Sequence, residues 1–197
     1  MCSDDLISPA LRHHAVLPSL LYVLSLSLSS VSSSIQPQGG GGRTALWKAA
    51  AYGHAEVVKL LIADGKADVD KAQNTGSTPL YIAAGRGHTE VVKLLITDGE
   101  AAVDKADNNG CTPLWKAANK GFTEIVKLLI TDGKAAVDTA RNDGCTPLYM
   151  AADTGKTDVV RLLVKGGADV NIARQGWTPL MAAKEEGHQA VVALLEQ

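Results

Sequence analysis

Aromatic residues are scarce in this 197-residue chain, at 4% of the total, and Phe122 is the sole phenylalanine. Small and aliphatic residues supply most of the apolar content, which suits close packing of short helices better than a ring-lined cofactor pocket. The chain also lacks a large excess of either charge, because its formal net charge is −2. The chain as a whole therefore has no strong attraction for nucleic acid or for an anionic membrane surface.

Cysteine is also rare, with Cys2, Cys111 and Cys145 as the three thiols. An odd number without a Cys-x-x-Cys pair argues against a disulfide framework and against a zinc site. Cys111 and Cys145 lie 34 residues apart at the same position of a repeated pattern. Stacked helical units are about 8–10 Å apart, whereas a disulfide requires Cα atoms within about 7 Å. A disulfide between Cys111 and Cys145 is therefore not expected. Three unpaired thiols indicate a reducing, intracellular compartment.

The sequence contains no nucleophile elbow, no phosphate-binding glycine loop and no His-Glu-x-x-His motif. The run "GGGGR" at 39–43 has no Lys-Ser or Lys-Thr after it, and the pair His13-His14 has no further ligands nearby. We therefore assign no catalytic, cofactor-binding or metal-binding residue, and we expect a protein that is not an enzyme and needs no cofactor.

Long apolar runs are missing as well. The most apolar stretch, "AVLPSLLYVLSLSL" at 15–28, is shorter than the roughly 20 residues of a membrane-spanning helix, so no membrane span is expected. We treat residues 1–42 as a leader that ends in a glycine-rich linker. A secretory signal within 1–35, a disordered tail and a start codon placed too far upstream remain alternative interpretations.

What the sequence does contain is an internal repeat. The triplet Thr-Pro-Leu begins at Thr78, Thr112, Thr146 and Thr178, and a variant, Thr-Ala-Leu, begins at Thr44. The spacings are 34, 34, 34 and 32 residues, and a "VVKLLI"-like run recurs in step with them. A fixed period of this length is typical of a solenoid, in which each unit packs only on its neighbours.

One unit can be interpreted from local chemistry. Thr78 is a helix N-cap and Pro79 suits the first helical position, so a helix is predicted over about 80–86, ended by Gly87. A second helix follows, with Thr89 as its expected cap and an apolar stripe at i, i+3 and i+4, and it ends at 98–99. Each unit is therefore a turn and two short antiparallel helices.

These residues resemble ankyrin repeats: the pattern Thr-Pro-Leu-x-x-Ala-Ala-x-x-Gly-His, the Val-Val-x-Leu-Leu helix and "GGADVN" at 166–171. The resemblance covers about 43–197 and implies an all-α, ankyrin-type solenoid of helix-turn-helix repeats with short β-hairpin-like loops. We expect five repeats, at about 43–75, 76–109, 110–143, 144–175 and 176–197. Three units carry one residue more than the family's usual 33, which predicts a bulge after the second helix.

The family also implies a concave surface, built from first helices and hairpin tips, that grips another protein. Comparison of "TPLYIAAGRGHTEVVKLLITDG" at 78–99 with the copy at 112–133 shows six differences in 22 positions, most of them away from the apolar stripe. The candidate residues for contact with a partner lie at first-helix ends and hairpin tips: Tyr52, Asn74, Thr75, Ser77, Arg86, Asn108, Asn109, Lys120, Asn142, Asp143, Thr154 and Trp177.

We therefore predict a non-enzymatic scaffold that binds an unidentified partner protein, and the alternative is a targeting or regulatory subunit for a separate enzyme. Nucleic-acid binding is a third class, suggested by two series. The rings of Trp47, Tyr81, Trp115 and Tyr149 would have to stack on bases rather than pack in the interior. A basic row on the second helices would have to track phosphates, yet each member follows an acid by three residues, which predicts a neutralised, solvated face: Lys59, Lys93, Lys127 and Arg161.

Overall fold

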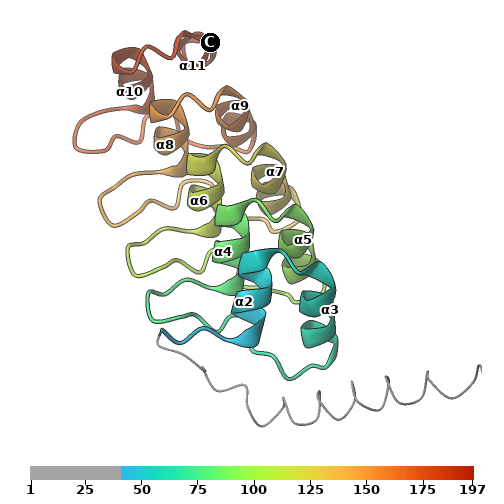
Figure 1. Ribbon diagram of the computed structural model, residues 1–197. Coiled ribbons are helices and arrows are strands. Elements are labelled where there is room, and N and C mark those ends of the chain that lie inside the picture. Colours follow the sequence, from blue (N-terminus) through green and yellow to red (C-terminus); the bar gives the residue numbers. More distant parts are fainter. Residues whose placement is uncertain (1–40) are drawn as a thin grey trace, which may run out of the picture. The chain divides into compact units, whose positions relative to one another are not determined.

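The computed structural model describes residues 41–197, which belong to one compact unit (Figure 1). The leader, its secretory-signal alternative, the pair His13-His14 and most of the glycine linker lie outside the described residues. Within 41–197 the secondary structure consists of ten helices in five consecutive pairs, and the single β feature is an isolated bridge between Arg174 and Trp177. The predicted all-α solenoid class is confirmed.

The helices form two parallel rows along the stack (Figure 1). The first helices of the pairs make up one row: α2 (Ala45–Tyr52), α4 (Pro79–Arg86), α6 (Pro113–Lys120), α8 (Pro147–Asp153) and α10 (Pro179–Glu185). The second helices make up the other: α3 (Ala55–Ala63), α5 (Thr89–Thr97), α7 (Thr123–Thr131), α9 (Thr157–Lys165) and α11 (Gln189–Leu195). None of the helices in the described part of the chain is long and apolar enough to cross a membrane.

The first helices begin and end where their capping residues predict. The Oγ1 of Thr78 accepts a hydrogen bond from the N–H of Tyr81 at 3.1 Å, and Pro79 occupies the first turn. Gly87 closes α4 in the left-handed conformation, with φ of 83°. The same threonine cap recurs at the start of every first helix, so the starts of this row follow from local chemistry alone.

The second helices begin differently from the prediction. Thr89 was expected to be the cap of α5, but it is the first helical residue, and His88 is the N-cap without a side-chain capping bond. The N–H of Thr89 instead bonds to the carbonyl of Gly87 at 3.1 Å, in a tight turn between the two helices. The short turn places the side chain of residue 88 over the preceding unit, where it cannot cap its own helix.

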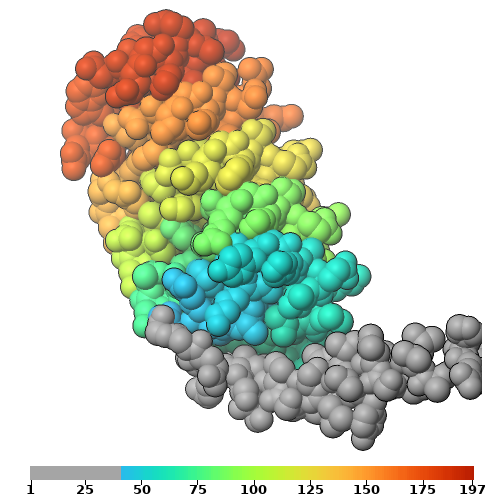
Figure 2. Space-filling view, viewed as in Figure 1, coloured from blue at the N-terminus to red at the C-terminus, as the bar shows by residue number. Residues whose placement is uncertain are grey.

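The core runs unbroken between the two rows of helices. Fully buried leucines from both rows interlock along it: Leu80, Leu114 and Leu148 from the first helices, and Leu95, Leu129 and Leu163 from the second. In the space-filling view the units follow one another as successive bands (Figure 2). A helix of seven to nine residues is marginal by itself in water, so each unit depends on its neighbours for stability.

The connection after the second helix shows the expected one-residue bulge in the second and third units. In the fourth unit the N–H of Ala168 bonds to the carbonyl of Leu163, five residues earlier. In the second unit the corresponding bond joins Ala101 to Leu95, six residues earlier. Glu100 accommodates the extra residue with φ of 49°. Aspartates then tie each connection to the next, as where the carboxylate of Asp104 accepts the N–H of Ala136 at 3.1 Å.

Candidate functional site

Three of the predicted partner-binding residues come together at the ends of the first helices. Tyr52 ends α2, Arg86 ends α4 and Lys120 ends α6, and all three side chains line one shallow hollow of about 530 Å³. Its complete lining is Ala51, Tyr52, Gly85, Arg86, His88, Lys120 and Phe122.

One wall of this hollow is built from an arginine and a tyrosine. Nη1 of Arg86 donates to the carbonyl of Ala51 at 2.8 Å, and the guanidinium carbon lies 5.6 Å from the centroid of the Tyr52 ring. Nε2 of His88 is 3.1 Å from the same Ala51 carbonyl. Arg86 at the end of α4 and His88, the N-cap of α5, therefore contact the last turn of α2, and the bond to Ala51 holds Arg86 against Tyr52. The Tyr52 side chain nevertheless stays 66% exposed, which is unusual for a large ring.

Glycine keeps the middle of the hollow open. A Cβ at Gly85 would lie 2.8 Å from Cγ of Lys116, so a larger residue here would displace that lysine. Phe122 lies against Gly87, where a Cβ would be 3.0 Å from the phenylalanine ring. The selection of candidate residues missed Gly85, His88 and Phe122. The signal that identifies them was present, because all three occupy positions that differ between the second and third units.

The predicted asparagines at the hairpin tips join the units to one another. Nδ2 of Asn108 donates to the carbonyl of Asn74 at 3.0 Å, and Nδ2 of Asn142 donates to the carbonyl of Asn108 at 3.2 Å. The main chain continues this ladder, since the N–H of Asn108 bonds to Thr75 and that of Asn142 bonds to Asn109. These residues are exposed, as expected, but their side chains are part of the scaffold.

Asp143 forms the most strongly charged contact at the tips. Its Oδ2 lies 2.6 Å from Nη2 of Arg141 and 2.8 Å from Nη2 of Arg174, which belongs to the next hairpin. Burial alone would raise the pKa of this carboxyl, but hydrogen bonds from Arg141 and from the N–H of Cys145, with the two positive charges, lower it overall. Asp143 is therefore already paired. Arg141 lies two residues away in the same hairpin, whereas only the fold brings Arg174 of the next hairpin to this carboxylate.

The last three predicted residues differ in how exposed they are. Ser77 is only 3% exposed, which corrects its assignment to the binding surface. It is enclosed because its carbonyl accepts the indole N–H of Trp47 at 3.1 Å. Thr154 is half-buried, and its hydroxyl donates to the carbonyl of Met150 at 2.7 Å. Trp177 is 44% exposed beside the shortened fourth hairpin.

The aromatic series packs in the interior. Trp47, Tyr81, Trp115 and Tyr149 are all buried. The faces of these rings are covered by cationic side chains of the protein itself. Arg141, for example, lies 5.3 Å from the centroid of the Trp115 ring. Rings in this position offer no stacking surface to a nucleic acid.

The basic row on the second helices is exposed, as predicted. Its four members were expected to pair with the acids three residues earlier. Among residues 41–197, however, none of these pairs approaches within the 4.0 Å of an ion pair. The acidic and basic side chains along this face are equal in number, but each is solvated separately. Their distance from the first-helix ends makes them suitable control positions for mutagenesis.

The two described thiols lie beside the buried rings. Cys111 and Cys145 are free, as expected, and they are buried just before the starts of α6 and α8. Burial, with the neighbouring Asp107 carboxylate, raises the pKa of Cys111 from 9.0 to about 11. Burial likewise raises the pKa of Cys145. Both thiols therefore stay protonated and unreactive at neutral pH.

This burial predicts slow alkylation of the native protein. In a Cys2→Ser variant, the thiolate fraction of Cys111 at pH 8 is about a hundredfold below that of an unshifted thiol. We expect iodoacetamide to modify the native variant about a hundredfold more slowly than the same variant in urea, measured by intact mass. Because the folded pKa is the higher one, Cys111 contributes stability below pH 9 that is lost as the pH rises towards 11. Equal alkylation rates in the two states would contradict the buried placement.

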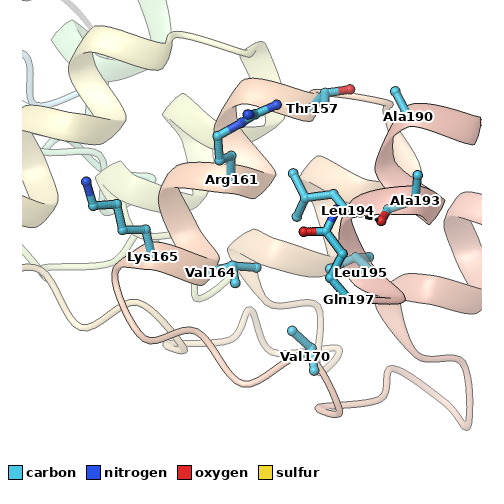
Figure 3. A pocket seen from close by; sticks show the side chains of 10 residues that line it. All are labelled: Thr157, Arg161, Val164, Lys165, Val170, Ala190, Ala193, Leu194, Leu195 and Gln197. Carbon is cyan, nitrogen blue, oxygen red and sulfur yellow. Dashed lines mark hydrogen bonds between the residues drawn. The ribbon is translucent and has the colours of Figure 1, made fainter.

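A second hollow, of about 560 Å³, lies between α9 and α11 (Figure 3). Its lining is mostly apolar, with Val164, Val170, Leu194 and Leu195 around it and the cations Arg161 and Lys165 on the α9 side. None of the predicted partner-binding residues lies in it. Within residues 41–197, no cluster of three or more His, Cys, Asp and Glu side chains is placed to hold a metal ion.

Comparison with known proteins assigns the architecture to a family. A family model described as ankyrin repeats in three copies matches the chain over residues 13–107, 46–139, 99–174 and 134–197. A search of curated proteins found no match. The overlapping family matches extend over all five helix pairs, whose capped first helices and stacked cores are described above. This chain therefore belongs to the ankyrin-repeat family.

Proposed function

We propose that this chain is a non-enzymatic scaffold that docks a partner protein on the concave side of the repeat stack. Ankyrin repeats are in general modules for protein–protein interaction, and their fold is typically non-catalytic. The observation that supports this proposal best is the hollow between the ends of α2, α4 and α6. There, five of the seven lining residues stand at positions that differ between the second and third units.

The chemistry of these residues suits a protein partner. Tyr and Arg are enriched among the residues that carry most of the energy in protein interfaces. Tyr52 presents a large exposed ring, and Arg86 is already held against it by its bond to Ala51. Little side-chain entropy is then lost when a partner covers them. Nucleic-acid binding has less support, because the aromatic series is buried.

The test is capture of partners from host lysate by the tagged full-length chain, with and without nuclease. A hollow variant, Tyr52→Ala/Arg86→Ala/Lys120→Ala, is compared with a control variant on the second helices, Leu60→Ala/Lys93→Ala/Lys127→Ala. The two variants lose the same number of charges and one exposed apolar side chain each, and thermal melting checks that both fold.

We expect the parent and the control to retain a nuclease-resistant protein that the hollow variant loses. Retention of the same protein by all three chains would contradict the proposed site. Recovery of nuclease-sensitive material alone would contradict the proposed function.

A further inference from the structure

The hollow carries positive charge that nothing in the described structure neutralises. Arg86 and Lys120 line it, and Lys116 lies beside Gly85 with its ammonium 5.7 Å from the centroid of the Tyr81 ring. Within residues 41–197, no carboxylate comes within 4.0 Å of these three side chains. One N–H of the Arg86 guanidinium bonds to Ala51, which leaves further donors of its five for a ligand.

The same row of helix ends becomes acidic towards the other end of the stack. The positions equivalent to Gly85 and Arg86 are Asp153 and Thr154 at the end of α8, and Glu185 and Glu186 at the end of α10. Glu185 and Glu186 are exposed and, among the described residues, take part in no ion pair. The row therefore changes sign along the stack, from cations and an aromatic ring at α2–α6, through the half-buried Asp153 at α8, to the exposed carboxylates at α10.

This change in the sign of the charge favours one class of ligand over another. A nucleic acid carries a negative charge at every step, so one that lay along the row would meet the carboxylates of α8 and α10. An extended peptide can match both halves, because its side chains differ from residue to residue. The ends of neighbouring first helices are about 8–10 Å apart. An extended peptide of roughly twelve residues is therefore long enough to span all five units.

Resting on the proposed function, we infer that the hollow takes a carboxylate side chain from an extended segment of the partner protein. An Asp or Glu of that segment lies between Arg86 and Lys120, and the apolar stem of this residue packs on Tyr52. Basic residues of the same segment lie over the ends of α8 and α10. The partner is thus a protein with a segment that is acidic in one half and basic in the other.

The test starts with a displayed library of random peptides of roughly twelve residues, which matches the reach of the row, selected on the full-length chain. Selected sequences are then synthesised with a fluorescent label, and their Kd is measured by anisotropy. Three double variants are compared: Arg86→Glu/Lys120→Glu in the hollow, Glu185→Lys/Glu186→Lys at α10, and Lys93→Glu/Lys127→Glu on the second helices. The last reverses the same charges as the first on another face. A labelled single-stranded oligonucleotide is titrated in parallel.

We expect the selected peptides to be rich in Asp and Glu in one half and in Lys and Arg in the other. The hollow variant should weaken their binding about tenfold or more, as when a central interface arginine is lost. The α10 variant should weaken it too, and the control should stay within about twofold, as is usual for charges outside an interface. Lys120→Glu alone serves as a second variant, because Lys120 makes no hydrogen bond or ion pair within the described residues and its loss leaves Arg86 in place.

Several outcomes would overturn the inference. They are a selection without acidic enrichment, equal Kd values for the hollow and control variants, and an oligonucleotide that binds more tightly than the peptides and depends on the hollow. Failure of this inference differs from failure of the proposed function. If the captured partner is lost with the alanine variant of the hollow but charge reversal has no effect on the peptides, the binding site stands and its acidic ligand does not.

Discussion

Replacing Leu114 by alanine is expected to lower the free energy of unfolding by about 2–5 kcal/mol. Leu114 lies on α6, in the middle unit, and is 0% exposed. Its loss removes apolar burial and leaves a cavity that neighbouring short helices cannot close without losing their own packing. Because α6 contacts the units on both sides, we expect the urea midpoint, followed by circular dichroism, to fall strongly.

The control is the same change at an exposed leucine. Leu60 on α3 is 60% exposed, because no earlier helix of the described residues covers this side of the first unit. Leu60→Ala should change the free energy of unfolding by no more than about 0.5 kcal/mol. If both substitutions cost the same, the core would not run through the middle of the stack as described.

Replacing Gly76 by alanine should destabilise the chain more than the same change at Gly144. Both glycines have φ of 81° and occupy the same place in their hairpins, so the left-handed conformation costs each alanine about 1–2 kcal/mol. At Gly76, however, a Cβ would lie 2.7 Å from the main-chain nitrogen of Asn108 and 2.9 Å from Cα of Asp107. Nothing lies within 4 Å of the corresponding point at Gly144.

The clash at Gly76 is with main chain of the next hairpin, which cannot rotate away. We therefore expect Gly76→Ala to cost about 1–3 kcal/mol more than Gly144→Ala. The relevant difference between the two sites is the hairpin that follows each one. The hairpin after Gly76 has its full length, whereas the one after Gly144 is shortened, because the fourth spacing is 32 residues instead of 34. Urea unfolding measures the difference directly. Equal costs would show that the asparagine ladder of the tips does not hold neighbouring units together.

Features that depend on a single unit could be predicted from the sequence. Thr78 and Gly87 fix the bounds of α4 through bonds to residues three or four positions away. The extra residue near Glu100 predicts the bulge for the same reason. The apolar stripe and the 34-residue spacing then determine that units stack, because a short helix has no other way to bury its stripe.

Features that depend on two units could not be predicted. Ser77 is polar and lies in a turn, yet the indole of Trp47 in the preceding unit encloses it. Thr89 is a miss within one unit: it has the right chemistry for a cap, but the tight local turn after Gly87 excludes that role. The pairing of Asp143 with Arg174 required the register of two hairpins. For the hollow, the altered positions pointed to the ends of the first helices, where it lies, but its open middle depends on Gly85 lying beside Lys116.

The central claim is that the residues that vary between units form the surface that a partner contacts. Amide hydrogen exchange of the full-length chain, with and without its captured partner, tests this claim most directly. The account predicts slower exchange at the ends of α2, α4 and α6, around Tyr52, Arg86 and Lys120, with little change over the C-terminal halves of α5 and α7, away from the hollow. Protection that falls instead on these halves of α5 and α7, or on the hollow between α9 and α11, would contradict it.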